Sequence, residues 1–327
     1  MAIVSPINQD LLALQKEMSA MGLGAPDIFS ISLDAARQQL AKQYEYLNKD
    51  LLDQVEVLDL GIWYSDQEVG CRCYFPDGIG TFPRNTLLVY IHGGGWSFGD
   101  QYTHHAIAQS FAKASGLSLV SIGYSLAPQK KHPHQNDECT HVLQELLKMF
   151  AKNYGSELDC ILIGDSAGAN IALSAYLNLF DADLKQKVLG LALFYGVYDS
   201  GPISQSWQDL GGGQYGLSIK SMNWYWDQFL SNPEDRLTSL AAPLHSRLEN
   251  LPPVWIAIGD LDPLIDENLA LVARVKATGG KCDHLIVEGY THGFLRFCNH
   301  LEEVKGLINQ FSLAVHSMIN GIDVERS

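Results

Sequence analysis

The sequence predicts an α/β protein built on a mostly parallel β-sheet that carries helices on both faces. Short apolar runs alternate with helical stretches between residues 87 and 287, and near-continuous apolar strands of this kind are buried on both sides. Two β-patterned runs precede the alternation and bring the expected sheet to eight strands. The 327 residues suffice for one large domain or two small ones, and the hydrophobic content of 46% suits a sizeable core.

The elements follow one another in a simple order. Residues 1–45 read as polar-faced helices ahead of any strand, so we expect them to form a cap, with the main domain over 46–327. Runs at 54–64 and 68–75 are joined by the short link Ser65-Asp66-Gln67, which predicts an antiparallel hairpin at one edge of the sheet. The buried strands are then expected at 87–91, 117–122, 160–163, 188–194, 254–258 and 284–287.

One long segment interrupts the alternation, at about residues 198–253. It is too long for a simple crossover, so we interpret it as a cap insertion over the carboxyl edge of the sheet. Its aromatic side chains either line a binding pocket or, for most of them, form the core of the cap; they are Trp207, Tyr215, Trp224, Tyr225 and Trp226. The glycines at 211–213 predict a turn, because no Gly-Lys-Ser/Thr follows to make a phosphate loop.

Charge and cysteine usage exclude several classes of protein. The formal net charge is −15, from 22 basic and 37 acidic residues, which argues against nucleic acid or an anionic membrane as a partner. The longest apolar stretch, 188–197, is too short to span a bilayer. The first residues lack the pattern of a signal peptide, and the six scattered cysteines form no C-x-x-C pair. We therefore expect a cytoplasmic protein with reduced thiols and no zinc site.

The pentapeptide at 164–168, Gly-Asp-Ser-Ala-Gly, predicts a nucleophilic serine. An apolar strand leads into it and a helical pattern leads out. In that context the chain reverses sharply and holds the hydroxyl of Ser166 at the carboxyl edge of the sheet, near the N-terminus of the next helix. A Gly/Ser turn before an ordinary helix is the plainer alternative, and the flanking elements favour the nucleophile.

A glycine-rich loop follows the first buried strand at 92–96, His-Gly-Gly-Gly-Trp. Consecutive glycines leave backbone N–H groups free to point into a site, and acyl transfer needs such donors for the negative charge on the carbonyl oxygen. We predict that the N–H groups of Gly93, Gly94 and Ala167 form this oxyanion hole. Because His92 precedes the nucleophile, we expect it to orient the glycine loop and not to act as the base.

A serine nucleophile needs a base and an orienting carboxylate. His292 comes directly after the last strand, where a loop can reach the nucleophile, and it is the predicted base. The sequence contains other histidines in helical or loop stretches, and of these His132 and His134 could be a metal pair, but Pro133 separates them and no third ligand is near. For the acid, position alone leaves three candidates after the preceding strand: Asp260, Asp262 and Asp266.

Together these motifs resemble the hormone-sensitive-lipase-like branch of the α/β-hydrolases, and within it the bacterial acetyl-esterase-like members. The resemblance runs from about residue 87 to 292 and rests on HGGGW, GYSLAP, GDSAG, GDLDPLIDE and THGF. It implies Ser166, His292 and Asp262 as the catalytic triad, Asp262 being the acid of the Asp-Pro-Leu motif. Asp165 matches a subgroup of the family, whereas Ala169 stands where several relatives carry a second glycine.

The resemblance implies an α/β-hydrolase fold with a helical cap and a serine carboxylesterase that uses no cofactor and no metal. We favour small esters with short acyl chains, acetyl to butyryl, since no long apolar lid is evident. Two alternatives stay open at this point. One is an amidase or deacetylase with the same triad, and the other is a non-catalytic ligand-binding protein, against which the three filled triad positions argue. The family implies monomers or homodimers.

Overall fold

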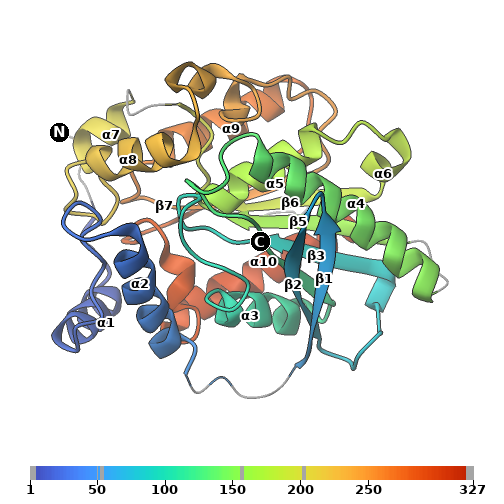
Figure 1. Cartoon of the computed structure of the whole chain (residues 1–327), viewed down its shortest axis with the longest axis horizontal. Helices are drawn as coiled ribbons and strands as arrows, with labels where there is room; N and C mark the ends of the chain where they lie inside the picture. Colours follow the sequence, from blue (N-terminus) through green and yellow to red (C-terminus); the bar gives the residue numbers. More distant parts are fainter. Residues whose placement is uncertain (1–4, 50, 52–54, 155–157, 201–203, 322–327) are drawn as a thin grey trace.

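A computed structural model describes residues 5–49, 51, 55–154, 158–200 and 204–321 of the chain (Figure 1). The sheet has eight strands in the order β1-β2-β4-β3-β5-β6-β7-β8. Their bounds are β1 Glu56–Tyr64, β2 Gln67–Phe75, β3 Thr86–Ile91, β4 Leu119–Gly123, β5 Asp159–Asp165, β6 Val188–Phe194, β7 Val254–Gly259 and β8 Cys282–Val287. The predicted strand number is confirmed.

Only the first edge of the sheet is antiparallel. Strand β1 pairs antiparallel with β2, and β2 pairs antiparallel with β4, whereas the strands from β4 through β3 to β8 are parallel to their neighbours. The hairpin turn is one residue shorter than expected, because Gln67 already belongs to β2. Ser65 takes a positive φ of 56° at this turn, which closes the link in two residues.

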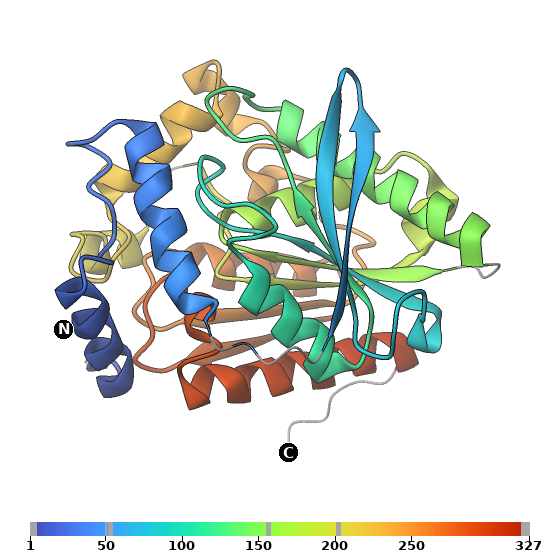
Figure 2. The ribbon, with the colours of Figure 1, turned by 60° about the horizontal axis from the view of Figure 1, so that its bottom comes forward.

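Helices cover both faces of the sheet, as Figure 2 shows. The helices α3 and α10 pack together on one face, and α4 and α5 pack together on the other. The helices of these two layers, with the short α6, are α3 His105–Ser115, α4 His134–Tyr154, α5 Ala167–Leu177, α6 Ala182–Gln186, α9 Ile265–Ala277 and α10 Glu302–Asn320. The central strands are accordingly buried on both sides: every residue of β3 and β7 is buried.

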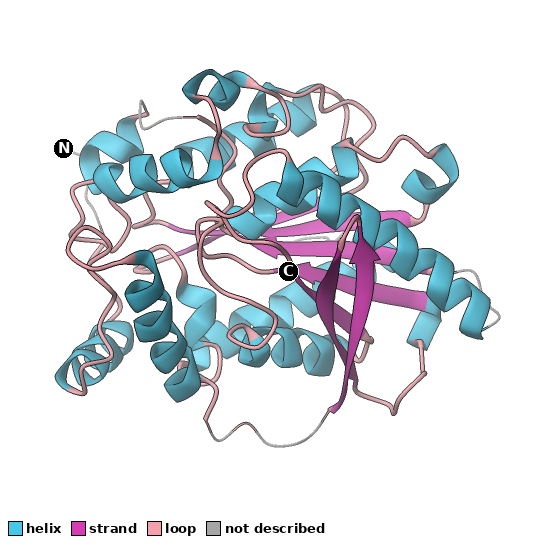
Figure 3. Cartoon of the chain, viewed as in Figure 1, coloured by secondary structure: helices cyan, strands magenta, loops and turns pink. Residues whose placement is uncertain are grey.

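Four further helices gather at one end of the sheet, on the left of Figure 1 and again in Figure 3. Two come from the N-terminal segment and two from the insertion: α1 Gln9–Ala20, α2 Leu33–Leu47, α7 Gln205–Leu210 and α8 Ile219–Phe229. The remaining elements are the 3₁₀ turns η1 Pro83–Asn85, η2 Pro233–Leu237, η3 Pro243–His245 and η4 Phe294–Phe297. In the described ranges no helix combines the length and the apolarity that crossing a bilayer requires.

The insertion has two parts with different neighbours. Its first part contains α8, whose Met222 and Tyr225 line the hollow above Ser166. Its second part runs beside α5, where Asn170 and Ser174 donate hydrogen bonds to the carbonyl oxygens of Ala241 and Leu240. The first part therefore lies over the carboxyl edge of the sheet, where Ser166 stands.

All six cysteines are buried and none forms a disulfide. Burial raises the pKa of these thiols, to about 11 for Cys298 and to about 12 for Cys73 and Cys282. A thiol whose pKa lies so far above neutrality is almost entirely protonated and therefore a poor nucleophile.

We expect the native protein to resist thiol labelling. Incubated with a disulfide reagent such as 5,5′-dithiobis(2-nitrobenzoate) at pH 7.5, the folded chain should react roughly 100-fold more slowly than the same chain in guanidinium chloride, because only the unfolded form exposes its thiols. The denatured sample, in which all six cysteines react, is the control. A cysteine that labels rapidly in the native protein would contradict the burial described above.

Candidate active site

The turn around Ser166 is tight and strained. Ser166 adopts φ 52° and ψ −120°, between the end of β5 and the start of α5, a conformation that L-residues rarely take. The two flanking glycines allow this turn, because a Cβ on Gly164 would lie 2.4 Å from the carbonyl oxygen of Gly168, and one on Gly168 would lie 2.1 Å from that of Ile91. The serine thus stands at the carboxyl edge of the sheet, as predicted.

Two hydrogen bonds join three side chains of distant origin. The Oγ of Ser166 lies 2.8 Å from Nε2 of His292, and Nδ1 of His292 lies 2.7 Å from Oδ2 of Asp262. The other carboxylate oxygen of Asp262 accepts a hydrogen bond from the N–H of Leu264 at 2.9 Å. Asp262 is fully buried and the His292 side chain is 15% exposed, so the pair is shielded while the serine end stays open to the hollow.

The three aspartates that position alone could not separate have three different partners. Only Asp262 contacts a histidine of the site. Asp260 accepts a hydrogen bond from the N–H of Gly289 at 2.7 Å, which links the loops after β7 and β8. Asp266 accepts one from the N–H of Ser206 at 2.8 Å and so holds the start of α7. Of the three aspartates, Asp262 is therefore the one that lies within hydrogen-bond distance of His292.

The glycine loop lies beside the serine because β3 and β5 are neighbours, with Ile91 paired to Gly164. The expectation for Gly93 is wrong in one respect: its N–H is not free but donates to Oδ1 of Asp165 at 2.7 Å. A Cβ on Gly93 would lie 2.5 Å from the same carboxylate, which explains the glycine there. In the part of the chain that the structure describes, the N–H groups of Gly94 and Gly95 have no protein acceptor.

The carboxylate of Asp165 holds the glycine loop in place through the hydrogen bond from Gly93. Its Oδ1 also accepts a hydrogen bond from the Tyr90 hydroxyl at 2.7 Å, and its Oδ2 lies 3.4 Å from the hydroxyl of Tyr195. Burial raises the pKa of the Asp165 carboxyl, while the hydrogen bonds from Tyr90 and Gly93 act in the opposite direction. The carboxylate is thus a buried acceptor that ties β3, β5 and β6 together under Ser166.

His92 lies under the glycine loop and does not contact Ser166. Its Nδ1 is 2.8 Å from the carbonyl oxygen of Gly93, and its ring stacks on Tyr124 at a centroid distance of 4.3 Å. Burial lowers the pKa of His92 to about 4, so the ring is neutral at physiological pH. These contacts fit the predicted role of His92 in orienting the loop.

The hollow above Ser166 is small, about 140 Å³. It is walled by the glycine loop, by α2, by the insertion and by the turn after His292, through the side chains or backbone of Leu40, Tyr44, Gly94, Gly95, Phe98, Ile107, Asp165, Tyr195, Val197, Leu217, Met222, Tyr225, Gly293 and Arg296. Among the predicted aromatic candidates Tyr225 lines the hollow, whereas Trp207 and Trp226 are buried in the core. The preference for the core interpretation therefore holds for these two tryptophans.

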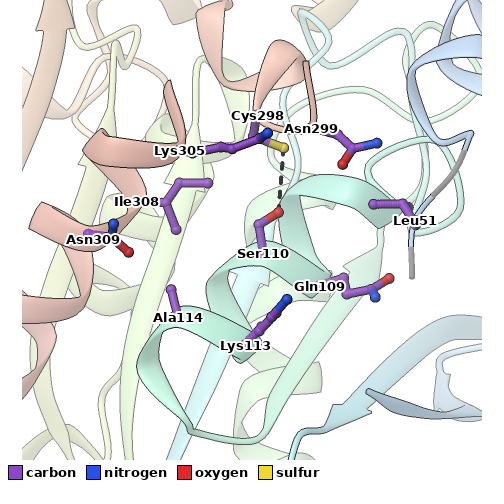
Figure 4. A pocket seen from close by; sticks show the side chains of 10 residues that line it. All are labelled: Leu51, Gln109, Ser110, Lys113, Ala114, Cys298, Asn299, Lys305, Ile308 and Asn309. Carbon is purple, nitrogen blue, oxygen red and sulfur yellow. Dashed lines mark hydrogen bonds between the residues drawn. The ribbon is translucent and has the colours of Figure 1, made fainter. Parts of the chain in front are cut away.

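A larger hollow of about 470 Å³ lies elsewhere, between α3, α10 and the residues after η4 (Figure 4). Its walls include Ser110 and Cys298, which contact each other at 3.7 Å, and two lysines, Lys113 and Lys305. None of the serine, histidine and aspartate that form the hydrogen-bonded chain lines it. Its size therefore says nothing about the ester-binding site.

Sequence reasoning missed several residues that line the small hollow. Gly95 was part of the recognised motif, but its role depends on the direction of a peptide bond that the motif does not specify. Leu40 and Tyr44 come from α2, and Arg296 from the turn η4, four residues after His292. The only available signal for Arg296 was its proximity in sequence to the predicted base.

The comparisons with known proteins identify the fold and the family. A family model described as the alpha/beta hydrolase fold matches residues 88–296. The chain is 31% identical over 233 residues to an acetyl esterase of Salmonella schwarzengrund, and 32% identical over the same length to one of Salmonella typhi; each match covers 70% of both chains.

Solved structures give the same class. An esterase of Pyrobaculum calidifontis superposes with a TM-score of 0.85 at 26% identity, covering 96% of this chain and 99% of that one. A thermophilic carboxylesterase cloned from a metagenomic library superposes with a TM-score of 0.82 at 27% identity, covering 90% and 99%. The fold and the site thus define a carboxylic ester hydrolase.

The chain belongs to the hormone-sensitive-lipase-like family of α/β-hydrolases. The family expectation drawn from the five motifs is confirmed, as are the eight-stranded sheet and the class of reaction.

Proposed function

We propose that the protein hydrolyses short-chain acyl esters, acetyl to butyryl, with Ser166 as nucleophile, His292 as general base and Asp262 as its orienting acid. The observation that carries the proposal is the continuous chain of two hydrogen bonds from Asp262 through His292 to Ser166, which ends at a hollow. A serine, a histidine and a carboxylate within hydrogen-bond distance form the arrangement that activates a hydroxyl for acyl transfer.

The first half of the reaction forms an acyl-enzyme. His292 Nε2 takes the proton of Ser166 as Oγ attacks the ester carbonyl, and the resulting imidazolium is stabilised by Asp262 at Nδ1. The tetrahedral intermediate then collapses as His292 returns the proton to the leaving alcohol. In the second half, His292 takes a proton from a water molecule as the water oxygen attacks the acyl carbonyl. The tetrahedral intermediate then collapses as His292 returns the proton to Oγ of Ser166, which releases the carboxylic acid and the free serine.

For the oxyanion hole we propose the N–H groups of Gly94, Gly95 and Ala167. Those of Gly94 and Gly95 lie on the loop that lines the hollow, and Ala167 begins α5 directly after the nucleophile. None of these three N–H groups has a protein acceptor in the described residues, so they remain available to the negatively charged oxygen. Asp165 contributes by holding Gly93, and with it the loop, in place.

We further propose that α1, α2 and the first part of the insertion act as a cap that limits the length of the acyl chain. The hollow of about 140 Å³ is well below the roughly 300 Å³ at which pockets for drug-sized ligands begin. Tyr44 and Tyr225 contribute bulky walls to it. The acetyl esterases among the relatives are named for a short acyl group, which supports the same range.

The test is hydrolysis of p-nitrophenyl esters from acetate to palmitate. We expect kcat/KM to be highest between acetate and butyrate and to fall by about 10-fold to 100-fold by octanoate, because methylenes that exceed the hollow must displace its walls. A maximum at octanoate or longer would contradict the short-chain proposal.

Tyr225→Ala is the matched variant for the same series. It removes one wall of the hollow, where the Tyr225 ring packs over Gly95, and should move the maximum towards longer chains. Lys148→Ala, an exposed residue of α4 that pairs with Glu145, is the control and should leave the profile unchanged. An unchanged profile in Tyr225→Ala would show that this hollow does not hold the acyl chain.

A further inference from the structure

Arg296 places a positive charge in the wall of the hollow that contains Ser166. It lies in η4, on the turn that follows His292, and it lines the same hollow as the serine, the histidine and Tyr225. An ester bound at Ser166 therefore lies next to a guanidinium group. Hydrolysis as described above uses no such group, so the chemistry of the triad does not explain its presence.

The guanidinium of Arg296 has no protein partner for its hydrogen-bond donors. Within the described residues it forms no ion pair and no hydrogen bond, and its Nε is shielded from solvent without an acceptor. Its Cζ lies over the ring of Phe297, 4.8 Å from the ring centroid. Three other arginines have partners: Arg37 donates to the carbonyl oxygens of Ser97 and Ala127, Arg72 pairs with Asp59, and Arg236 pairs with Asp227.

The carboxylates closest to the site already have hydrogen-bond partners other than Arg296. Asp262 is bonded to His292 and to the N–H of Leu264, and Asp165 is bonded to Tyr90 and Gly93. The phenols near Arg296 in the hollow belong to Tyr44, Tyr195 and Tyr225. They are protonated at neutral pH, because burial raises the pKa of all three, to about 12 for Tyr225. In a chain with a net charge of −15, the half-buried guanidinium of Arg296 is thus left without a compensating anion among the described residues.

The buried Nε–H of Arg296 has no acceptor in the part of the chain that the structure describes, and leaving a buried donor without a hydrogen bond is costly. Water can supply the acceptor in the free enzyme, but a carboxylate does it better, because its two oxygens match the fork of the guanidinium and the bonds are charge-assisted. The charge stands beside the reacting carbonyl, so the anion that fits is part of the ester itself.

We propose that Arg296 is a specificity-determining residue that selects esters carrying a carboxylate. Two classes of substrate share this chemistry: half-esters of dicarboxylic acids, with the charge on the acyl side, and acylated hydroxy acids, with the charge on the alcohol side. This inference rests on the proposed function, because it assumes that the ester binds at Ser166.

The test compares esters that differ only in a carboxylate or a carboxamide. Monomethyl succinate is compared with methyl succinamate for the acyl side, and 4-carboxyphenyl acetate with 4-carbamoylphenyl acetate for the alcohol side, each corrected for its rate of alkaline hydrolysis. In at least one pair we expect the wild-type enzyme to prefer the carboxylate by about 10-fold or more in kcat/KM, as a charge-assisted hydrogen bond predicts.

Arg296→Gln should lower this preference by about 10-fold to 100-fold, mainly by raising KM for the carboxylate, because it removes the charge that pairs with it. Arg296→Lys keeps the charge without the fork and should retain part of the preference. Lys152→Gln, an exposed residue of α4, removes the same charge outside the hollow and should leave the ratio as in the wild type.

The outcomes separate this inference from the proposed function. Hydrolysis of the neutral esters without any preference for a carboxylate would overturn the role of Arg296 and leave the esterase proposal standing. A preference that persists in Arg296→Gln would also overturn it. Absence of hydrolysis of all four esters and of p-nitrophenyl acetate would instead refute the proposed function. Should Arg296→Gln fail to fold, the wild-type ratio and Arg296→Lys still decide the question.

Discussion

Replacing Ser166 with alanine should reduce kcat for p-nitrophenyl acetate by about 10⁴-fold to 10⁶-fold, the range seen when the nucleophile of a serine hydrolase is removed. The methyl group of alanine cannot attack a carbonyl, while the hydrogen bond between Asp262 and His292 can persist without the serine. The measurement is a steady-state assay beside circular dichroism, which should show an unchanged fold because the backbone at this position is not altered by the substitution.

Ser110→Ala is the matched control for this experiment. Ser110 is a partly buried serine in the larger hollow, where its hydroxyl contacts only the sulfur of Cys298. Its replacement should leave kcat within about twofold of the wild type, as is usual for substitutions away from a site. Loss of activity in Ser110→Ala together with full activity in Ser166→Ala would mean that the reaction takes place in the larger hollow and not at Ser166.

The second large effect is expected for Asp262→Asn, which should lower kcat by about 10⁴-fold. The asparagine amide can donate to His292 Nδ1, which then favours the tautomer with its proton on Nε2. In that tautomer the imidazole cannot accept the proton of Ser166. The assay should be run from pH 6 to 9 so that a displaced pH profile is not mistaken for a loss of activity.

Asp260→Asn tests the assignment of the acid. Its carboxylate oxygen accepts a hydrogen bond from the N–H of Gly289, and an amide oxygen can accept the same bond. Activity should therefore stay within about threefold of the wild type, since the site geometry is retained. If Asp260→Asn were as damaging as Asp262→Asn, the assignment of the acid to Asp262 would fail.

The sheet could be predicted from the sequence because buried parallel strands leave a local signal. Runs such as 188–194 and 254–258 are apolar along their whole length, and this pattern depends little on what packs against them. Strand ends were less accurate: β8 begins at Cys282, two residues before the predicted start, because the exposed, charged Asp283 separates the buried Cys282 from the rest of the run.

The proximity of Ser166, His292 and Asp262 could be predicted because topology brings the carboxyl ends of parallel strands together. Ser166 and His292 each follow a strand, and the hydrogen bond between them joins residues 126 positions apart. The same reasoning could not choose among Asp260, Asp262 and Asp266, because all three follow β7. The side-chain direction that separates them depends on the turn, which position in the sequence does not specify.

The glycine loop shows the limit of what a sequence motif can predict about the direction of backbone N–H groups. Three consecutive glycines predict free N–H groups. The backbone dihedral angles decide which of these N–H groups point into the hollow. Gly94 and Gly95 adopt φ of 117° and 57°, which turns their N–H groups away from Asp165, the acceptor of Gly93. Arg296 could not be predicted for a related reason. A single arginine forms no sequence motif, and its lack of a hydrogen-bond acceptor is visible only in the structure.

If esters bind at Ser166 as proposed, the position of α2 couples the N-terminal segment to substrate affinity. Arg37 of this helix donates hydrogen bonds to the carbonyl oxygens of Ser97 and Ala127, while Leu40 and Tyr44, one and two turns further along, contribute to the wall around Ser166. A substrate that contacts Leu40 and Tyr44 binds only when α2 is docked, that is, packed against the loop that Arg37 contacts. Substrate binding and the docking of α2 therefore stabilise each other by the same free energy. The apparent dissociation constant is then the intrinsic one divided by the docked fraction. The affinity for an ester is therefore set in part by contacts of Arg37 that no ester touches.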